Sequence, residues 1–212
     1  MKKILIAVPC MDMVSARFAQ SLSSLKKVGE CSAMFIIGSL VYDSRNQLAQ
    51  YAIQQEADYI MWFDSDMVFA PDTLERMMKT LDEHKEIDIL SGLYFRRSTP
   101  FTPVAFDKLE LTEDMRCEWE DMTEVPTELT EIAGCGFGCV LMRTDCLLDI
   151  AGKYGGTWFS PFGNVGEDCS FCIRARREGY RIFIDPSIKL GHMGYAAVTE
   201  EFYKVIKENK NG

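Results

Sequence analysis

The sequence predicts an α/β fold in which a mostly parallel sheet is built within a single domain. Three observations predict it: the chain length of 212 residues, short apolar runs that alternate with helical periodicities, and a change of rhythm after Gly92. Strands that alternate with helices of about 10 to 15 residues are typical of βαβ units, whose strands run parallel. With 47% hydrophobic and 26% charged residues, the composition is that of one globular domain.

The first half of the chain contains four short apolar runs that we predict to be strands. They are residues 4–8, 33–37, 59–63 and 87–90. Apolar residues recur at helical spacing between these runs, which predicts three helices. The first is capped by Asp12 or Ser15, the second begins at Ser44, and the third has Pro71 in its first turn.

Shorter elements follow Gly92. Loops and short strands are expected to about residue 131, and they form a small antiparallel portion. A helix over 144–150, a helix over 167–178 and a strand over 180–184 complete the domain, which we expect to extend over residues 1–212 with a polar tail at about 204–212.

Charge is unevenly distributed along the chain. The total of 23 basic and 32 acidic residues gives a net charge of −9, but nine of the acidic residues and only Arg116 among the basic ones fall within residues 109–131. The remaining 22 basic and 23 acidic residues nearly balance. We therefore predict an acidic insertion at about residues 107–131, and we expect none of the broad basic surface that non-specific nucleic-acid binding requires.

The apolar runs and the cysteines indicate the compartment. No run approaches the roughly 20 residues that span a bilayer, so no transmembrane segment is expected. The run at 4–8 ends at Pro9 and lacks a following cleavage site, which is unlike a secretory signal. We therefore expect a cytoplasmic protein whose eight cysteines are free thiols.

Asp64 and Asp66 follow directly after the apolar run at 59–63. Side chains two residues apart on a strand point the same way, and carboxylates that close repel each other unless a cation lies between them. Carboxylate oxygens suit Mg²⁺ or Mn²⁺, and ligands of parallel sheets bind beyond the carboxyl ends of the strands. We expect a metal site here; two loop aspartates that cap the next helix are the alternative.

Two later motifs carry groups suited to proton transfer or metal binding. Glu167 and Asp168 stand at a predicted helix start, where a carboxylate can accept a proton from a hydroxyl, although acids are also favoured there by the helix dipole. His192 lies between Gly191 and Gly194 with little local packing, and neutral imidazole is a ligand of Mn²⁺. A purely structural histidine is the alternative.

The order of these motifs resembles nucleotide-sugar-dependent glycosyltransferases of the GT-A fold, in particular the glycosyltransferase family 2-like proteins of bacteria and their viruses. The ordered motifs are Asp64-x-Asp66, Gly92-x-Tyr94-x-x-Arg97, the glycine-rich residues 134–138, Gly166-Glu167-Asp168 and Gly191-His192. The resemblance extends from about Met1 to Tyr195, and it implies a single GT-A (Rossmann-like) domain.

The resemblance implies how donor and metal are held. Asp64, Ser65 and Asp66 match the motif that binds the donor diphosphate and ribose, and the two aspartates with His192 match the ligands of a Mn²⁺ or Mg²⁺ ion. Pro9 matches the end of the first strand, where the nucleotide base packs.

Further nucleotide-sugar contacts are implied by the same resemblance. Arg45 is expected near the base or the phosphates, and Arg97 is expected in contact with the nucleotide-sugar. The donor is a UDP- or GDP-sugar, and its base stays undefined because no acidic residue follows the second predicted strand until Asp43.

The sugar and the acceptor are implied to bind near residues 134–138 and an aromatic segment. Gly136 and Trp158, with Phe159 beside it, match the segment that lines this pocket, although ordinary core packing is the alternative for the two aromatic residues. Asp168, with Glu167 beside it, matches the base of inverting members. A divalent ion neutralises the departing diphosphate while a carboxylate deprotonates the acceptor hydroxyl.

Other functions fit parts of the sequence. Asp64 also fits the nucleophile of a haloacid-dehalogenase-like phosphatase, although that motif normally follows the first strand of its domain. Cys169 and Cys172 with Cys135 and Cys139 are an alternative zinc site. A nucleotidyltransferase would require a glycine-rich basic loop after the first strand, and a non-catalytic nucleotide-sugar or carbohydrate-binding module would keep the same binding residues.

Overall fold

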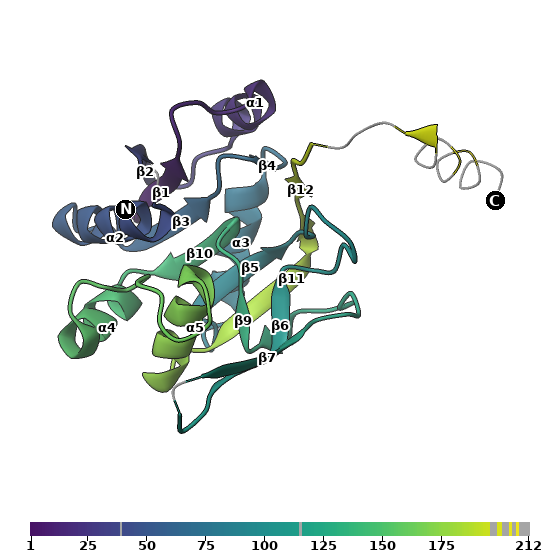
Figure 1. Cartoon of the computed structure of the whole chain (residues 1–212). Coiled ribbons are helices and arrows are strands. Elements are labelled where there is room, and N and C mark those ends of the chain that lie inside the picture. Colours follow the sequence, from purple (N-terminus) through teal and green to yellow (C-terminus); the bar gives the residue numbers. More distant parts are fainter. Residues whose placement is uncertain (39, 115, 196–198, 201–203, 205–206, 208–212) are drawn as a thin grey trace.

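The computed structural model of the chain describes residues 1–38, 40–114, 116–195, 199–200, 204 and 207, and it confirms the predicted α/β class. A seven-stranded sheet crosses the molecule, and helices pack on both of its faces (Figure 1). The strand order is β2 (Glu30–Ile37), β1 (Lys3–Cys10), β3 (Tyr59–Phe63), β10 (Cys139–Arg143), β5 (Ile89–Leu93), β11 (Ile182–Lys189) and β8 (Thr130–Ile132).

Most strands of this sheet run in one direction, as predicted. β1 pairs in parallel with β2 and β3, and β5 pairs in parallel with β11. β10 lies antiparallel between β3 and β5, so these two strands run the same way, and β8 closes one edge antiparallel to β11. The carboxyl ends of β1, β3 and β5 therefore meet at one side of the sheet, where ligands of such sheets bind.

The helices form two layers. α1 (Ala16–Ser24) and α3 (Thr73–Glu83) cover one face, and α2 (Val41–Gln54), α4 (Asp145–Tyr154) and α5 (Glu167–Arg177) cover the other. Ser15 caps α1 as predicted, since its side chain accepts a hydrogen bond from the Phe18 amide. α2 begins earlier than predicted, whereas α5 begins at Glu167 as predicted and includes Glu167 and Asp168 in its first turn.

Two small antiparallel sheets complete the fold. One contains β7 (Cys117–Asp121), β6 (Ala105–Leu111) and β9 (Gly134–Cys135), and the other pairs β12 (Gly191–His192) with β4 (Met67–Val68). The predicted acidic segment therefore forms much of the β6–β7 hairpin and the edge strand β8. The predicted polar tail at 204–212 lies outside the described residues except at Lys204 and Lys207.

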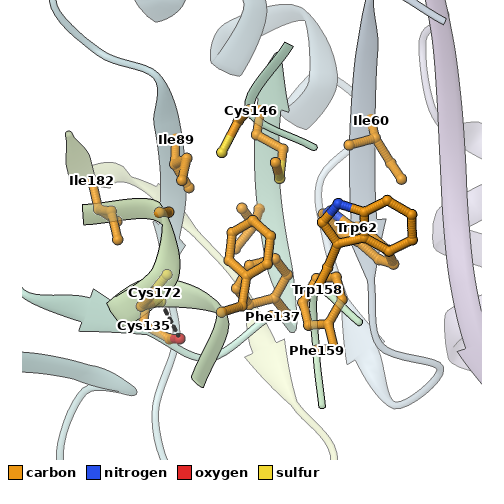
Figure 2. Packing of buried hydrophobic residues seen from close by; sticks show 14 of the residues in the cluster. Ile60, Trp62, Ile89, Cys135, Phe137, Cys146, Trp158, Phe159, Cys172 and Ile182 are labelled. Atoms are coloured by element: carbon orange, nitrogen blue, oxygen red, sulfur yellow. Dashed lines mark hydrogen bonds between the residues drawn. The ribbon is translucent and has the colours of Figure 1, made fainter. Parts of the chain in front are cut away.

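The core under the carboxyl ends of the strands is rich in aromatic side chains, several of which Figure 2 shows. Phe159 lies 5.1 Å from Trp62 and 4.9 Å from Phe137 between ring centroids, and it stacks on Phe171. These packed rings give the site above them a rigid base. Among the described residues, no helix combines the length and the apolar character that crossing a bilayer requires.

Candidate active site

A cavity of about 320 Å³ opens at the carboxyl ends of β1 and β3. Most of the predicted site residues line this cavity, although they come from distant parts of the chain. They are Pro9, Arg45, Asp64, Ser65, Asp66, Arg97, Glu167, Asp168 and His192. Gly136 lines a second cavity that adjoins the first and shares Arg97, Asp168 and His192 with it.

Asp64 and Asp66 lie in a turn and not on a strand. β3 ends at Phe63, the Asp64 amide donates to Gly138 O, and the Met67 amide donates back to Asp64 O at 3.1 Å. Strand alternation, which was expected to orient both carboxylates, is therefore not what orients them. Both side chains line the cavity, but the turn gives each its own partners.

Asp64 contacts a buried arginine beneath the cavity. The Arg45 side chain is 2% exposed, and its Nη2 donates to Asp64 Oδ1 at 2.9 Å. The same Nη2 lies 3.4 Å from Asp168 Oδ1, and Arg45 Nε lies 3.7 Å from Glu167 Oε1. One guanidinium thus faces three carboxylates. We call Arg45, Asp64, Glu167 and Asp168 the floor cluster.

Asp168 has the environment of a carboxyl group that exchanges protons near neutral pH. Burial raises its pKa to about 7, and the charge of Glu167 adds to this, while Arg45 opposes the shift. The Phe137 amide donates to Asp168 Oδ2 at 3.2 Å, which fixes the orientation of the carboxyl group. Perturbed carboxyls of this kind are frequent at catalytic sites.

Asp66 contacts Arg97 and His192 at the cavity mouth. Arg97 Nη1 donates to Asp66 Oδ2 at 2.7 Å, and His192 Nε2 lies 3.5 Å from the same oxygen. Burial opposes ionisation of Asp66, but His192 and Arg97 outweigh it and lower the pKa of the carboxyl group. We call Asp66, Arg97 and His192 the rim cluster.

The pairing of β12 with β4 explains how His192 reaches Asp66. His192 is opposite Met67, and the Met193 amide donates to Asp66 O at 2.9 Å. His192 Nδ1–H donates to Phe95 O at 2.8 Å, so Nε2 is the ring nitrogen that faces Asp66. Burial lowers the pKa of His192, but hydrogen bonding with Asp66 outweighs burial and raises it overall.

Two of the three predicted metal ligands, Asp66 and His192, lie next to each other in the rim cluster. A histidine whose second ring nitrogen donates to a carbonyl is typical of metal ligands, and Asp66 Oδ2 is its neighbour. Asp64 is the third predicted ligand, and its Oδ1 is bound to Arg45 instead of facing the other two. Accordingly, no group of three or more His, Cys, Asp or Glu side chains in the described part of the chain could hold a metal ion.

Tyr94 is a site residue that the sequence analysis quoted only as part of a motif. It lines the cavity and is almost fully buried, its hydroxyl accepts from the Gly138 amide at 3.0 Å, and its ring meets His192 edge to face. A Cβ at Gly136 would collide with the Tyr94 hydroxyl, and one at Gly138 would lie 2.8 Å from its ring. Gly136 and Gly138 are therefore required by the close approach of Tyr94.

Trp158 does not line either cavity, which corrects the expectation that it contacts the sugar. It is 2% exposed, and its Nε1 donates to Leu147 O at 2.6 Å, so its polar atom is satisfied inside the core. Phe159 is likewise buried and packs with Trp62 and Phe137 (Figure 2). A hydrophobic ring next to three core rings gains more from burial than from exposure at a pocket wall.

Comparison with known proteins identifies the family. The profile of glycosyl transferase family 2 matches residues 41–148, just over half of the chain. The chain belongs to this family. The matched region of this family 2 glycosyltransferase contains Arg45, Asp64, Asp66, Tyr94 and Arg97, whereas α5 and His192 lie beyond it.

Solved structures agree with the family on the fold, which is GT-A. A197 from STIV superposes with a TM-score of 0.64 and 17% identity, over 92% of this chain and 87% of that chain. GalNAc-T7, determined with UDP, GalNAc and Mn²⁺, gives a TM-score of 0.62 and 10% identity over 92% of this glycosyltransferase, which spans 43% of the GalNAc-T7 chain. No curated protein matches significantly.

Proposed function

We propose that this glycosyltransferase is a metal-dependent, inverting enzyme that transfers a sugar from a UDP- or GDP-sugar to a hydroxyl acceptor. The observation that carries the proposal is the opening of one cavity onto both the rim cluster and Asp168. A diphosphate bound at the rim cluster would then lie in the same cavity as Asp168, whose carboxyl group is suited to accept a proton.

The donor side of the proposal rests on the rim cluster. Asp66 and His192 would hold a Mn²⁺ or Mg²⁺ ion, which neutralises the charge that develops on the departing diphosphate. Mg²⁺ sites commonly use one or two protein carboxylates, substrate phosphates and waters, so two protein ligands suffice. The presence of UDP and Mn²⁺ in the structure of GalNAc-T7 supports this choice of donor and metal.

The nucleoside is proposed to lie over Pro9, Cys10 and Val41 at the carboxyl end of β1. This part of the cavity contributes apolar side chains and backbone, so the base is bound mainly by packing and by main-chain hydrogen bonds. Ser65 and Arg97 flank the path of the diphosphate from this end toward Asp168.

Asp168 is proposed as the base that deprotonates the acceptor. It lines both cavities, so a donor in the first cavity and an acceptor hydroxyl in the second would meet at its carboxylate. Arg96, Phe106 and Gly136 line the second cavity and would contact the acceptor. Attack from this side, opposite the diphosphate, inverts the anomeric carbon.

The proposed compartment is the cytoplasm. All eight cysteine thiols are free, which supports a reducing environment.

A screen of nucleotide sugars with Mn²⁺ tests the function. Purified enzyme is incubated with UDP- and GDP-sugars, and the released nucleoside diphosphate is measured with and without EDTA. We expect slow Mn²⁺-dependent release from one donor class even without acceptor, since water replaces the hydroxyl. Tight UDP or GDP binding by calorimetry without any release, in the presence of acceptor extracts, would instead indicate a binding module.

A further inference from the structure

Arg45 differs from an ordinary surface arginine because it is a cation in the cavity wall whose side chain is only 2% exposed. Its guanidinium lies 5.4 Å from the Phe137 ring centroid, 5.8 Å from that of Phe159 and 5.9 Å from that of Trp62. Figure 2 shows these three rings packed together in the core. Desolvated cations are attracted to aromatic faces, so the rings hold the guanidinium from below.

The opposite side of the guanidinium faces carboxylates from two separate elements. Asp64 follows β3, while Asp168 belongs to the first turn of α5, and Nη2 of Arg45 is the atom nearest to both. The contact with Asp64 at 2.9 Å is a hydrogen bond. The contact with Asp168 at 3.4 Å is an ion pair without one, so Arg45 connects the two residues electrostatically.

Several polar atoms of this cluster lack hydrogen bonds. Nε and Nη1 of Arg45 and Oδ1 of Asp168 are buried without a hydrogen-bond partner. Arg174, the other buried arginine of this layer, donates instead to the backbone carbonyls of Trp158 and Ser160 at 2.9 and 2.8 Å. A purely structural arginine is satisfied in this way, whereas unsatisfied buried groups mark functional clusters.

We propose that Arg45 is a positioning residue, which holds the carboxylates of Asp64 and Asp168 in a fixed relative position and does not bind the donor. The proposal rests on the proposed function, and it replaces the expectation that Arg45 lies against the base or phosphates. With 2% of its side chain exposed, Arg45 offers almost no surface to a phosphate. A phosphate would have to displace Asp64 to reach Nη2.

Arg45 is expected to hold these carboxylates in place because the floor cluster contains more negative than positive charge. Three carboxylates face one guanidinium, so removal of that charge leaves Asp64, Glu167 and Asp168 to repel one another. The carboxylate of Asp168 would then turn away from the point where both cavities meet. Misplacement of a catalytic group by about 1 Å can lower the rate by about 100-fold.

The test compares Arg45→Lys and Arg45→Met with Arg174→Lys as a matched buried control. Lysine keeps the charge but reaches only one carboxylate as a point charge, and methionine removes the charge while filling the space. We measure kcat and the donor KM by nucleoside diphosphate release, the Kd for UDP or GDP with Mn²⁺ by calorimetry, and the melting temperature. Arg174→Lys reports the cost of altering a buried arginine that contacts no catalytic carboxylate.

We expect kcat to fall by about 100-fold in Arg45→Met and by less in Arg45→Lys, while KM and Kd stay within about twofold of the wild type. Arg174→Lys is expected to lower the melting temperature and leave kcat of the folded enzyme unchanged. A Kd weakened tenfold in Arg45→Lys with kcat intact would identify Arg45 as a donor ligand and overturn the proposal. Equal losses of kcat in Arg45→Lys and Arg174→Lys would reduce it to a structural role.

The proposal can still be tested if Arg45→Met does not fold or if the wild type turns over no donor. If Arg45→Met does not fold, Arg45→Lys decides by the same split between kcat and KM. If the wild type releases nucleoside diphosphate from no donor, the proposed function fails. The calorimetric comparison still decides whether Arg45 contacts the nucleotide, since an unchanged Kd supports positioning and a weakened Kd contradicts it.

Discussion

The floor cluster and the rim cluster each pair one aspartate of the Asp-x-Asp motif with an arginine, but the two arginines differ. The side chains of Asp64 and Asp66 are both 31% exposed, whereas the side chain of Arg45 is 2% exposed and that of Arg97 is 52% exposed. A buried ion pair is screened little by water and salt, while an exposed pair is screened by both and exchanges partners readily.

Asp64 and Asp66 therefore have different roles, although they are only two residues apart. Asp64 is fixed to Arg45 and through it to Asp168, so the floor cluster is preorganised before any ligand binds. Asp66 is held by Arg97 and His192 at the cavity mouth, so a metal ion can replace these contacts. The floor cluster is therefore expected to stay fixed when ligands bind, whereas the contacts of the rim cluster are expected to exchange.

The largest effect is expected from Asp66→Ala. Loss of the rim carboxylate removes one of the two side chains proposed to hold the metal, so Mn²⁺-dependent UDP or GDP binding and turnover should both disappear. Calorimetry with UDP or GDP and Mn²⁺ measures the first, and nucleoside diphosphate release measures the second. Asp12→Ala, at an exposed aspartate outside the cavity, is the control. Full activity of Asp66→Ala would remove the metal assignment.

Asp168→Asn is expected to separate binding from catalysis in the floor cluster. The amide cannot accept the proton of the acceptor, so kcat should fall by about 10² to 10⁴-fold while the Kd for the nucleoside diphosphate with Mn²⁺ stays near that of the wild type. Transfer at the wild-type rate would show that the base lies elsewhere.

The pH dependence of kcat is expected to report the floor cluster. Burial raises the pKa of Asp168 to about 7, and the base must be ionised, so kcat should fall as the pH drops below about 7. Stability should show the opposite trend. A carboxyl group whose folded pKa exceeds its usual 3.8 contributes stability below that value, and the contribution is lost as the pH rises to about 7. A pH profile of kcat and melting curves from pH 4 to 8 measure both.

The smallest effect is expected from Arg97→Ala in the rim cluster. Arg97 shares Asp66 Oδ2 with the proposed metal, so its removal should raise Mn²⁺ affinity by about threefold to tenfold, in keeping with the modest strength of exposed ion pairs. Titration of Mn²⁺ by calorimetry or electron paramagnetic resonance measures the change. Arg96→Ala, which breaks the pair with Asp121 instead, should leave Mn²⁺ affinity unchanged. Weaker Mn²⁺ binding in Arg97→Ala would contradict an exchangeable rim.

Local signals in the sequence predicted the helices and strands well, but they predicted the residues at which these begin and end less well. The apolar runs at 4–8 and 59–63 are strands, and Ser15 caps the first helix because its hydroxyl accepts from a nearby amide. The start of α2 was missed because Leu40 provides no side-chain cap to mark it. The turn after Phe63 was predicted only as an alternative, since one of its hydrogen bonds depends on Gly138 of a distant segment.

Side-chain roles were harder to predict than side-chain types. Arg45 and Trp158 were both assigned to ligand binding, yet Trp158 lies in the core, and the Arg45 side chain, although it lines the cavity, is only 2% exposed. An arginine or a tryptophan suits a binding site and a core equally well by composition, because each has both an apolar body and polar atoms. Which role it has depends on the neighbours that the fold supplies.

The sequence by itself determined the α/β class, the order of motifs and the residue types of the site, because periodicity and strand-end placement are properties of neighbouring residues. Only the tertiary structure decided that His192 meets Asp66 through β12 and β4, and that Arg45 lies between Asp64 and Asp168. Those contacts join residues far apart in the chain, and they depend on long-range packing that no local pattern encodes.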